Sequence, residues 1–102
     1  MYLVQLLLPI EGKQGQPVER AVFQRLEEQL TTQFGRLTAY TRAPATGLWE
    51  AESGRKVRDQ VVVYEVMVEH LELPWWALLR RRLEHELDQD EVVVRAQTIQ
   101  RL

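Results

Sequence analysis

The stretch KVRDQVVVYEVMVEHL, residues 56–71, decides the fold because it is long and rich in β-branched residues. Side chains of a strand alternate between its two faces. One face here is uniformly apolar and the other mixes apolar residues with a carboxylate: Val62, Tyr64, Val66 and Val68 against Val61, Val63, Glu65 and Met67. The pattern predicts a strand with one covered face and one bare face.

Patterns on both sides of this strand predict three more strands and two helices. Apolar residues recur every four positions after Pro17, and Gly35 is expected to end that helix. Pro74 opens the second helix, whose apolar stripe holds Trp75, Leu79, Leu83 and Leu87. The expected ranges are strands at 2–10, 37–43, 56–71 and 91–99, with helices at 17–35 and 74–89.

This order predicts one ferredoxin-like α+β domain over residues 1–102, with the βαββαβ arrangement and both helices on one face of an antiparallel sheet. Right-handed crossovers give the strand order fourth, first, third, second. The same alternation directs Val4, Leu6 and Leu8 of the first strand, and Val92, Val94 and Ala96 of the last, toward the helices.

Composition narrows the classes of function. The net charge is −2, with both signs interspersed, which argues against a nucleic-acid binder. The chain has no cysteine, so it has neither disulfides nor cysteine metal sites. The apolar opening is too short to span a bilayer and lacks the marks of a signal peptide. We therefore expect a cytoplasmic protein that contacts neither nucleic acid nor membrane.

The bare face of the sheet is half apolar, and a second copy packed sheet against sheet is the simplest cover for it. We therefore predict a homodimer. Its polar members are the candidate ligand-binding residues: Gln5, Tyr40, Arg42, Glu65 and Arg95. Two interpretations stay open. Either Glu65 pairs with Arg95 or Arg42 and only fixes the dimer, or the sheets enclose a partly polar cavity for a small anionic or aromatic ligand.

Trp49 lies in RAPATGLWEAESGR, residues 42–55, which reads as a loop with a short strand at 48–52 and a tight turn at Ser53 and Gly54. A large indole in such a segment suits an interface anchor or the lid of a pocket. We count Trp49 among the ligand-binding candidates.

Histidines and arginines give weaker signals. His70 ends the long strand, and it and Tyr40 are the candidates for proton transfer. Neither His70 nor His85 has a metal-binding spacing, so we expect no metal and no cofactor. Arg80 and Arg82 stand four residues before Glu84 and Glu86, which predicts ion pairs on a solvated helix face.

The segments TAYTRAPATGLWE, VRDQVVVYEVMV and WWALLRRRLEHELDQDEVVVRA resemble a widespread family of small, uncharacterised bacterial proteins of the dimeric α+β barrel type. The resemblance implies two ferredoxin-like domains packed through their sheets, and it implies no catalytic residues. The wider superfamily includes monooxygenases and isomerases.

Three functions follow as hypotheses. The first is a dimer that binds a small molecule at the open sheet face without catalysis. The second is a small cofactor-independent enzyme, in which Tyr40 or His70 transfers a proton and Arg42 or Arg95 holds an anionic substrate. The third is a non-catalytic dimeric interaction module.

Overall fold

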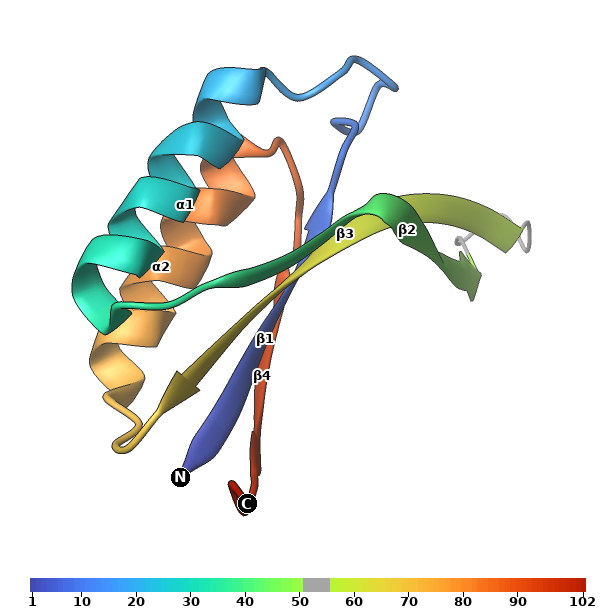
Figure 1. Ribbon diagram of the computed structural model, residues 1–102. Helices are drawn as coiled ribbons and strands as arrows, with labels where there is room; N and C mark the ends of the chain where they lie inside the picture. The colour runs from blue at the N-terminus through green and yellow to red at the C-terminus, as the bar shows by residue number, and fades with distance from the viewer. Residues whose placement is uncertain (51–55) are drawn as a thin grey trace.

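The computed structural model describes the backbone of residues 1–50 and 56–102, and the side chains of residues 1–40 and 60–102. Within these residues four strands and two helices follow one another in the order strand, helix, strand, strand, helix, strand (Figure 1). Their bounds are β1 (Tyr2–Pro9), α1 (Arg20–Phe34), β2 (Thr38–Glu50), β3 (Lys56–Val68), α2 (Leu73–Glu86) and β4 (Val93–Thr98).

The strands form one antiparallel sheet in the order β2-β3-β1-β4, which confirms the predicted order. Both helices lie side by side on one face of the sheet, and the far ends of β2 and β3 extend beyond them (Figure 1). The α+β class is therefore confirmed, and the arrangement is compatible with a ferredoxin-like fold. Assembly into a dimer stays a prediction. Across the described ranges 1–50 and 56–102, no helix is long and apolar enough to cross a membrane.

The core lies between the sheet and the helices, and alternation along β1 and β3 predicts its residues. Val4, Leu6 and Leu8 are buried, as are all four apolar residues assigned to the covered face of β3. Tyr64 is 1% exposed, and its hydroxyl donates a 3.0 Å hydrogen bond to Glu27 Oε1 on α1. The prediction is wrong at the end of β4, where Ala96 is exposed and Val94 only partly buried, because β4 is the edge strand.

The first turn of α1 differs from the prediction. The helix begins at Arg20, whereas Pro17 forms an isolated β-bridge with Glu11. The loop after β1 therefore doubles back on itself before the helix starts. Proline cannot donate a backbone hydrogen bond, so it fits this bridge as well as it fits a helix start.

The sequence places Trp75 on the buried stripe of α2, but the structure buries its neighbour Trp76 more deeply. Trp76 is buried at 6% exposure, whereas Trp75 is only partly buried. Trp76 stacks on Phe34 of α1 with ring centroids 5.2 Å apart, and Trp75 meets the same ring edge-on. The helix starts at Leu73, and its buried stripe runs through Trp76, Leu79 and Leu83.

The short strand predicted at 48–52 is confirmed as far as Glu50, but the loop expected before it is instead part of β2. The strand continues to Glu50, with a shift of register between Tyr40 and Ala45. Pro44 lies within that irregularity, where a missing backbone donor breaks no regular ladder. Trp49 pairs with Val57 through the backbone, but its side chain lies outside the described residues. The turn predicted at Ser53 and Gly54 also lies outside them.

Candidate functional site

A continuous row of polar side chains crosses the open face of the sheet, and each strand contributes one residue to it. We call this set the polar row: Tyr40 on β2, Glu65 on β3, Gln5 on β1 and Arg95 on β4. Backbone register puts Gln5 directly opposite both Glu65 and Arg95. Tyr40 is paired with Val63, two residues from Glu65, and so reaches it diagonally.

Three hydrogen bonds join the polar row from end to end. The Tyr40 hydroxyl donates to Glu65 Oε1 at 3.0 Å. The Gln5 amide nitrogen donates to Glu65 Oε2 at 2.6 Å, and its amide oxygen accepts from Arg95 Nε at 3.0 Å. Reversing the amide would turn its oxygen to a carboxylate and its nitrogen to a guanidinium, so its neighbours fix its orientation.

Among the described side chains, the donors to Glu65 are the neutral Tyr40 and Gln5, and Gln5 separates Glu65 from Arg95. The expectation that Glu65 pairs directly with Arg95 is wrong within one chain, because β1 lies between their strands. Neighbouring strands are about 4.8 Å apart, so the two backbones are roughly 10 Å from each other. The side chain of Arg42, the other expected partner, lies outside the described residues.

Apolar side chains border the polar row on both sides. Leu7, Val63 and Val93 are level with one another in the register on one side. Leu3 and Met67 are level on the other side. Tyr40, Met67 and Val93 are all exposed, Tyr40 to 52%. Among the described side chains, the face therefore combines the Glu65 carboxylate and the Arg95 guanidinium with a partly apolar surface; Arg42, predicted on the same face, lies outside them.

The Tyr40–Glu65 contact sets the protonation state of the phenol. The hydrogen bond to Glu65 and the negative charge of Glu65 raise the pKa of Tyr40 above its ordinary value of 10.0. At neutral pH the phenol keeps its proton. Tyr40 is consequently suited to donating a hydrogen bond and poorly suited to acting as a general base.

Other candidates from the sequence lie away from the polar row. His70 is exposed in the bend that follows β3, five residues beyond Glu65. His85 is exposed on α2. The ion pairs predicted on α2 are confirmed, with Arg80 3.2 Å from Glu84 and Arg82 3.4 Å from Glu86. Among the residues described, no group of three or more His, Asp or Glu side chains could hold a metal ion.

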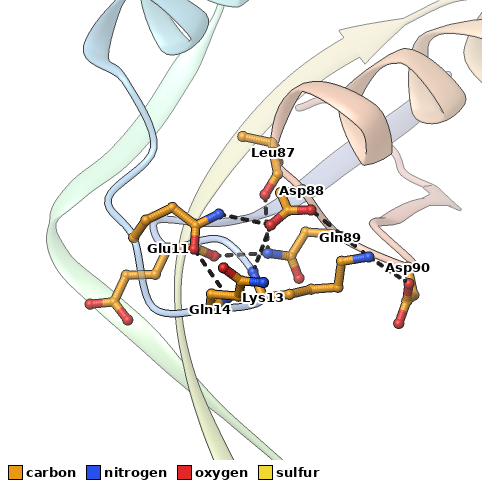
Figure 2. A network of polar contacts seen from close by, with 8 residues as sticks. Glu11, Lys13, Gln14, Leu87, Asp88, Gln89 and Asp90 are labelled. Carbon is orange, nitrogen blue, oxygen red and sulfur yellow. Dashed lines mark hydrogen bonds and ion pairs between the residues drawn. The ribbon is translucent and has the colours of Figure 1, made fainter.

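A second polar cluster, which sequence reasoning missed, joins the loop after β1 to the turn after α2 (Figure 2). Gln16 donates to Asp88 Oδ2 at 2.7 Å, and the Lys13 ammonium lies 3.1 Å from Asp90 Oδ1. The Gln16 hydrogen bond lowers the pKa of Asp88, and Asp90 raises that of Lys13. These partners are over 70 residues apart, so no local pattern indicates them. The cluster holds the loop after β1 against the turn after α2. Its charged groups already bind one another, so we do not treat it as a ligand site.

Two surface hollows lie over the helices and include no residue of the polar row. One of about 520 Å³ lies over α1 and α2, between Arg25 and Arg82. Another of about 390 Å³ lies beside the loop that carries Gln16. Both are open and are bordered by residues that the fold already uses. The open sheet face therefore remains the stronger candidate site.

Comparison with known proteins shows one relevant likeness. No protein-family model and no curated protein matches the sequence. Among solved structures, a phage SAM lyase in complex with S-methyl-5'-thioadenosine superposes with a TM-score of 0.63 at 14% identity. The match covers 94% of this chain and 79% of the lyase chain. At that identity it shows the fold.

These findings revise two expectations. The predicted membership of a widespread bacterial family gains no support beyond the small α+β fold. The hypothesis placed first, a dimer that binds a small molecule without catalysis, is corrected. The solved structure that shares this fold is that of an enzyme, whereas the hypothesis placed first was a protein without catalysis.

Proposed function

We propose that the protein is a small cofactor-independent enzyme of the lyase type, acting on a sulfonium nucleoside such as SAM at the open face of its sheet. The observation that carries the proposal is the polar row. It presents a carboxylate and a guanidinium on one face, separated by Gln5. The likeness of the fold to a SAM lyase suggests the substrate class.

The charges of the polar row complement those of SAM, which carries a sulfonium, an ammonium and a carboxylate. Glu65 supplies the negative charge that attracts the cationic groups, and the ring of Tyr40 adds a π face beside it. Arg95 is exposed and, within the described chain, its hydrogen bond uses only Nε. Its two terminal nitrogens can bind the substrate carboxylate.

The reaction requires no proton to be removed. Release of S-methyl-5'-thioadenosine breaks the bond between sulfur and the amino-acid chain, and the electron pair of that bond goes to sulfur. The substrate's own carboxylate oxygen can form the new bond at that carbon, which gives a lactone without a second reactant. Tyr40, which stays protonated, then positions Glu65 and is not a base.

The apolar border of the polar row suits such a step. A carboxylate and a sulfonium are both neutralised as the new bond forms, so a site poor in water favours the transition state over the charged ground state. Leu7, Val63 and Met67 lie where they would exclude water from the substrate. Positioning of the carboxylate behind the carbon under attack supplies the rest of the acceleration.

Chromatography of SAM incubated with the protein tests the proposal. We expect time-dependent formation of S-methyl-5'-thioadenosine, with kcat/KM reduced about 10- to 100-fold in Glu65→Gln and in Arg95→Gln, the loss of one charge-assisted interaction. Glu27→Gln is the matched control, because Glu27 accepts from Tyr64 at the same 3.0 Å on the covered face. His70→Gln tests the remaining proton-transfer candidate separately.

Binding of S-methyl-5'-thioadenosine without turnover of SAM would contradict the proposal, as would equal rates in Glu65→Gln and the wild type. Arg42 and Trp49 belong to the proposed binding set through their place on the β2–β3 hairpin. Arg42→Gln and Trp49→Phe should raise KM more than they lower kcat if they contact the nucleoside.

A further inference from the structure

We infer that a second copy of this chain covers the open sheet face about a two-fold axis parallel to β1, so that the partner's Arg95 lies against Glu65 and completes the site. The assembly is inferred from the residues of the open sheet face and does not depend on the proposed function. The catalytic part of the inference rests on the function proposed above.

The register of the sheet makes the polar row complementary to itself. Gln5 lies on β1, with Glu65 one strand away on β3 and Arg95 one strand away on β4. An axis that runs along β1 and passes over Gln5 exchanges β3 with β4. Glu65 of one copy then faces the partner's Arg95, and the same contact repeats on the other side of the axis.

On the Leu7 side of the polar row the neighbouring residues obey the same symmetry, whereas on the Leu3 side Met67 faces the partner's Gln97. Val63 and Val93 both pair with Leu7, from β3 and β4 respectively, so they stand at equal distances from the axis. In the dimer Val63 faces the partner's Val93, and Leu7 faces the partner's Leu7. Apolar contacts therefore lie beside the two ion pairs and shield them from water.

An axis perpendicular to the strands gives the opposite result. It would set Glu65 against the partner's Glu65 and Arg95 against the partner's Arg95. Like charges placed across an interface repel each other, which disfavours that arrangement. The distribution of charge along the polar row thus favours the axis along β1 over the axis perpendicular to the strands.

Both charged groups have capacity for this second contact. Among the side chains that the structure describes, each Glu65 oxygen accepts one hydrogen bond, from Tyr40 or from Gln5, and a carboxylate oxygen has two lone pairs. Within the described residues the hydrogen bond of Arg95 uses Nε, so one terminal nitrogen can contact the partner's Glu65 while the other holds the substrate carboxylate. The intermolecular pair therefore adds to the polar row without breaking it.

Tyr40 marks where a substrate would enter the dimer. Tyr40 lies on β2. With the axis over β1, the partner's edge strand β4 lies opposite β3, so β2 extends past the edge of the partner's sheet. The ring of Tyr40, 52% exposed in one chain, accordingly stays at the margin of the interface. Each dimer would have two such openings, formed by Tyr40 and Glu65 of one copy and the partner's Arg95.

Charge reversal tests the axis. We expect the wild type to have the mass of two chains by sedimentation velocity. Glu65→Arg and Arg95→Glu should each be monomeric, because each sets like charges against one another. An equimolar mixture of the two variants should regain the dimer mass, as should the double variant with both changes. Glu28→Arg and Arg81→Glu carry the same changes of charge on exposed helix positions and should remain dimers.

Cross-linking gives a second measurement if a reversed charge prevents folding. The chain has no cysteine, so Glu65→Cys and Arg95→Cys chains can be mixed and oxidised without competing thiols. We expect a disulfide-linked dimer only in the mixture. A monomeric wild type, self-linking of Glu65→Cys alone, or failure of the mixtures to associate would each overturn the inferred axis.

Activity separates this inference from the proposed function. A mixture of Glu65→Arg with Arg95→Glu rebuilds one native pairing of Glu65 with Arg95 per dimer, so it should recover about half of the wild-type rate from two inactive variants. Recovery of dimer mass with no SAM cleavage by any sample, the wild type included, would leave the assembly standing and refute the function. Recovered mass with a fully active wild type and an inactive mixture would refute the composite site.

Discussion

At the scale of single residues, the Tyr40–Glu65 contact gives a prediction that needs no substrate. Glu65 raises the pKa of Tyr40 above 10.0, so the contact stabilises the fold below that pH and its contribution is lost as pH rises through the folded-state pKa. The difference between the ultraviolet titrations of wild type and Tyr40→Phe isolates this phenol from Tyr2 and Tyr64.

Glu65→Gln should move that isolated titration back toward an ordinary tyrosine. Glu27→Gln serves as the control, because it acts on Tyr64 and should leave the Tyr40 signal in place. An unchanged Tyr40 titration in Glu65→Gln would mean that the hydroxyl does not donate to this carboxylate in solution.

The candidate site could be predicted from the sequence only in part, for a reason visible at this scale. Alternation places Gln5, Glu65 and Arg95 on one face, but it does not say which of them are adjacent. Register decides that, and register is a property of paired strands. The bridging role of Gln5 was therefore missed, and a direct Glu65–Arg95 pair was expected in its place. The diagonal reach of Tyr40 has the same origin.

At the scale of elements, Gly35 tests how α1 is ended. It has φ 80°, and its amide donates to the Thr31 carbonyl at 2.7 Å. A Cβ here meets no neighbouring atom, so the cost of Gly35→Ala is the left-handed backbone itself, about 1–2 kcal/mol. Urea unfolding should show this loss with an unchanged slope. A loss below about 0.5 kcal/mol would mean that α1 frays at this end.

The elements show which signals are reliable and which are ambiguous. Four-residue spacing of apolar residues predicts the body of α1, and glycine predicts its end. Proline is less informative: Pro17 lies in a β-bridge, Pro74 in the first turn of α2 and Pro44 in an irregular part of β2. Proline excludes a hydrogen-bonded position without choosing among the structures that tolerate it. For this reason the part of β2 around Pro44 was expected to be a loop between two short strands.

At the scale of the whole molecule, the two faces of the sheet differ in what they require of a residue. The helices bury the central strands β1 and β3 on one face, whereas the other face keeps half-buried apolar side chains around the polar row. Adjacent residues of β3 therefore have different surroundings, because one faces the helices and the next faces the open side of the sheet. Val62 lies 6% exposed in the core, and Val63 lies partly exposed on the open face.

The same substitution at these two neighbours should consequently have two different results. Val62→Glu places an unpaired carboxylate in the core and should cost about 4 kcal/mol or more, enough to unfold the chain. Val63→Glu should leave a folded chain with wild-type circular dichroism. It should also remove any dependence of the melting temperature on protein concentration, because that dependence comes from association of folded chains. If Val63→Glu keeps the concentration dependence of the wild type, the open face is not where the copies meet.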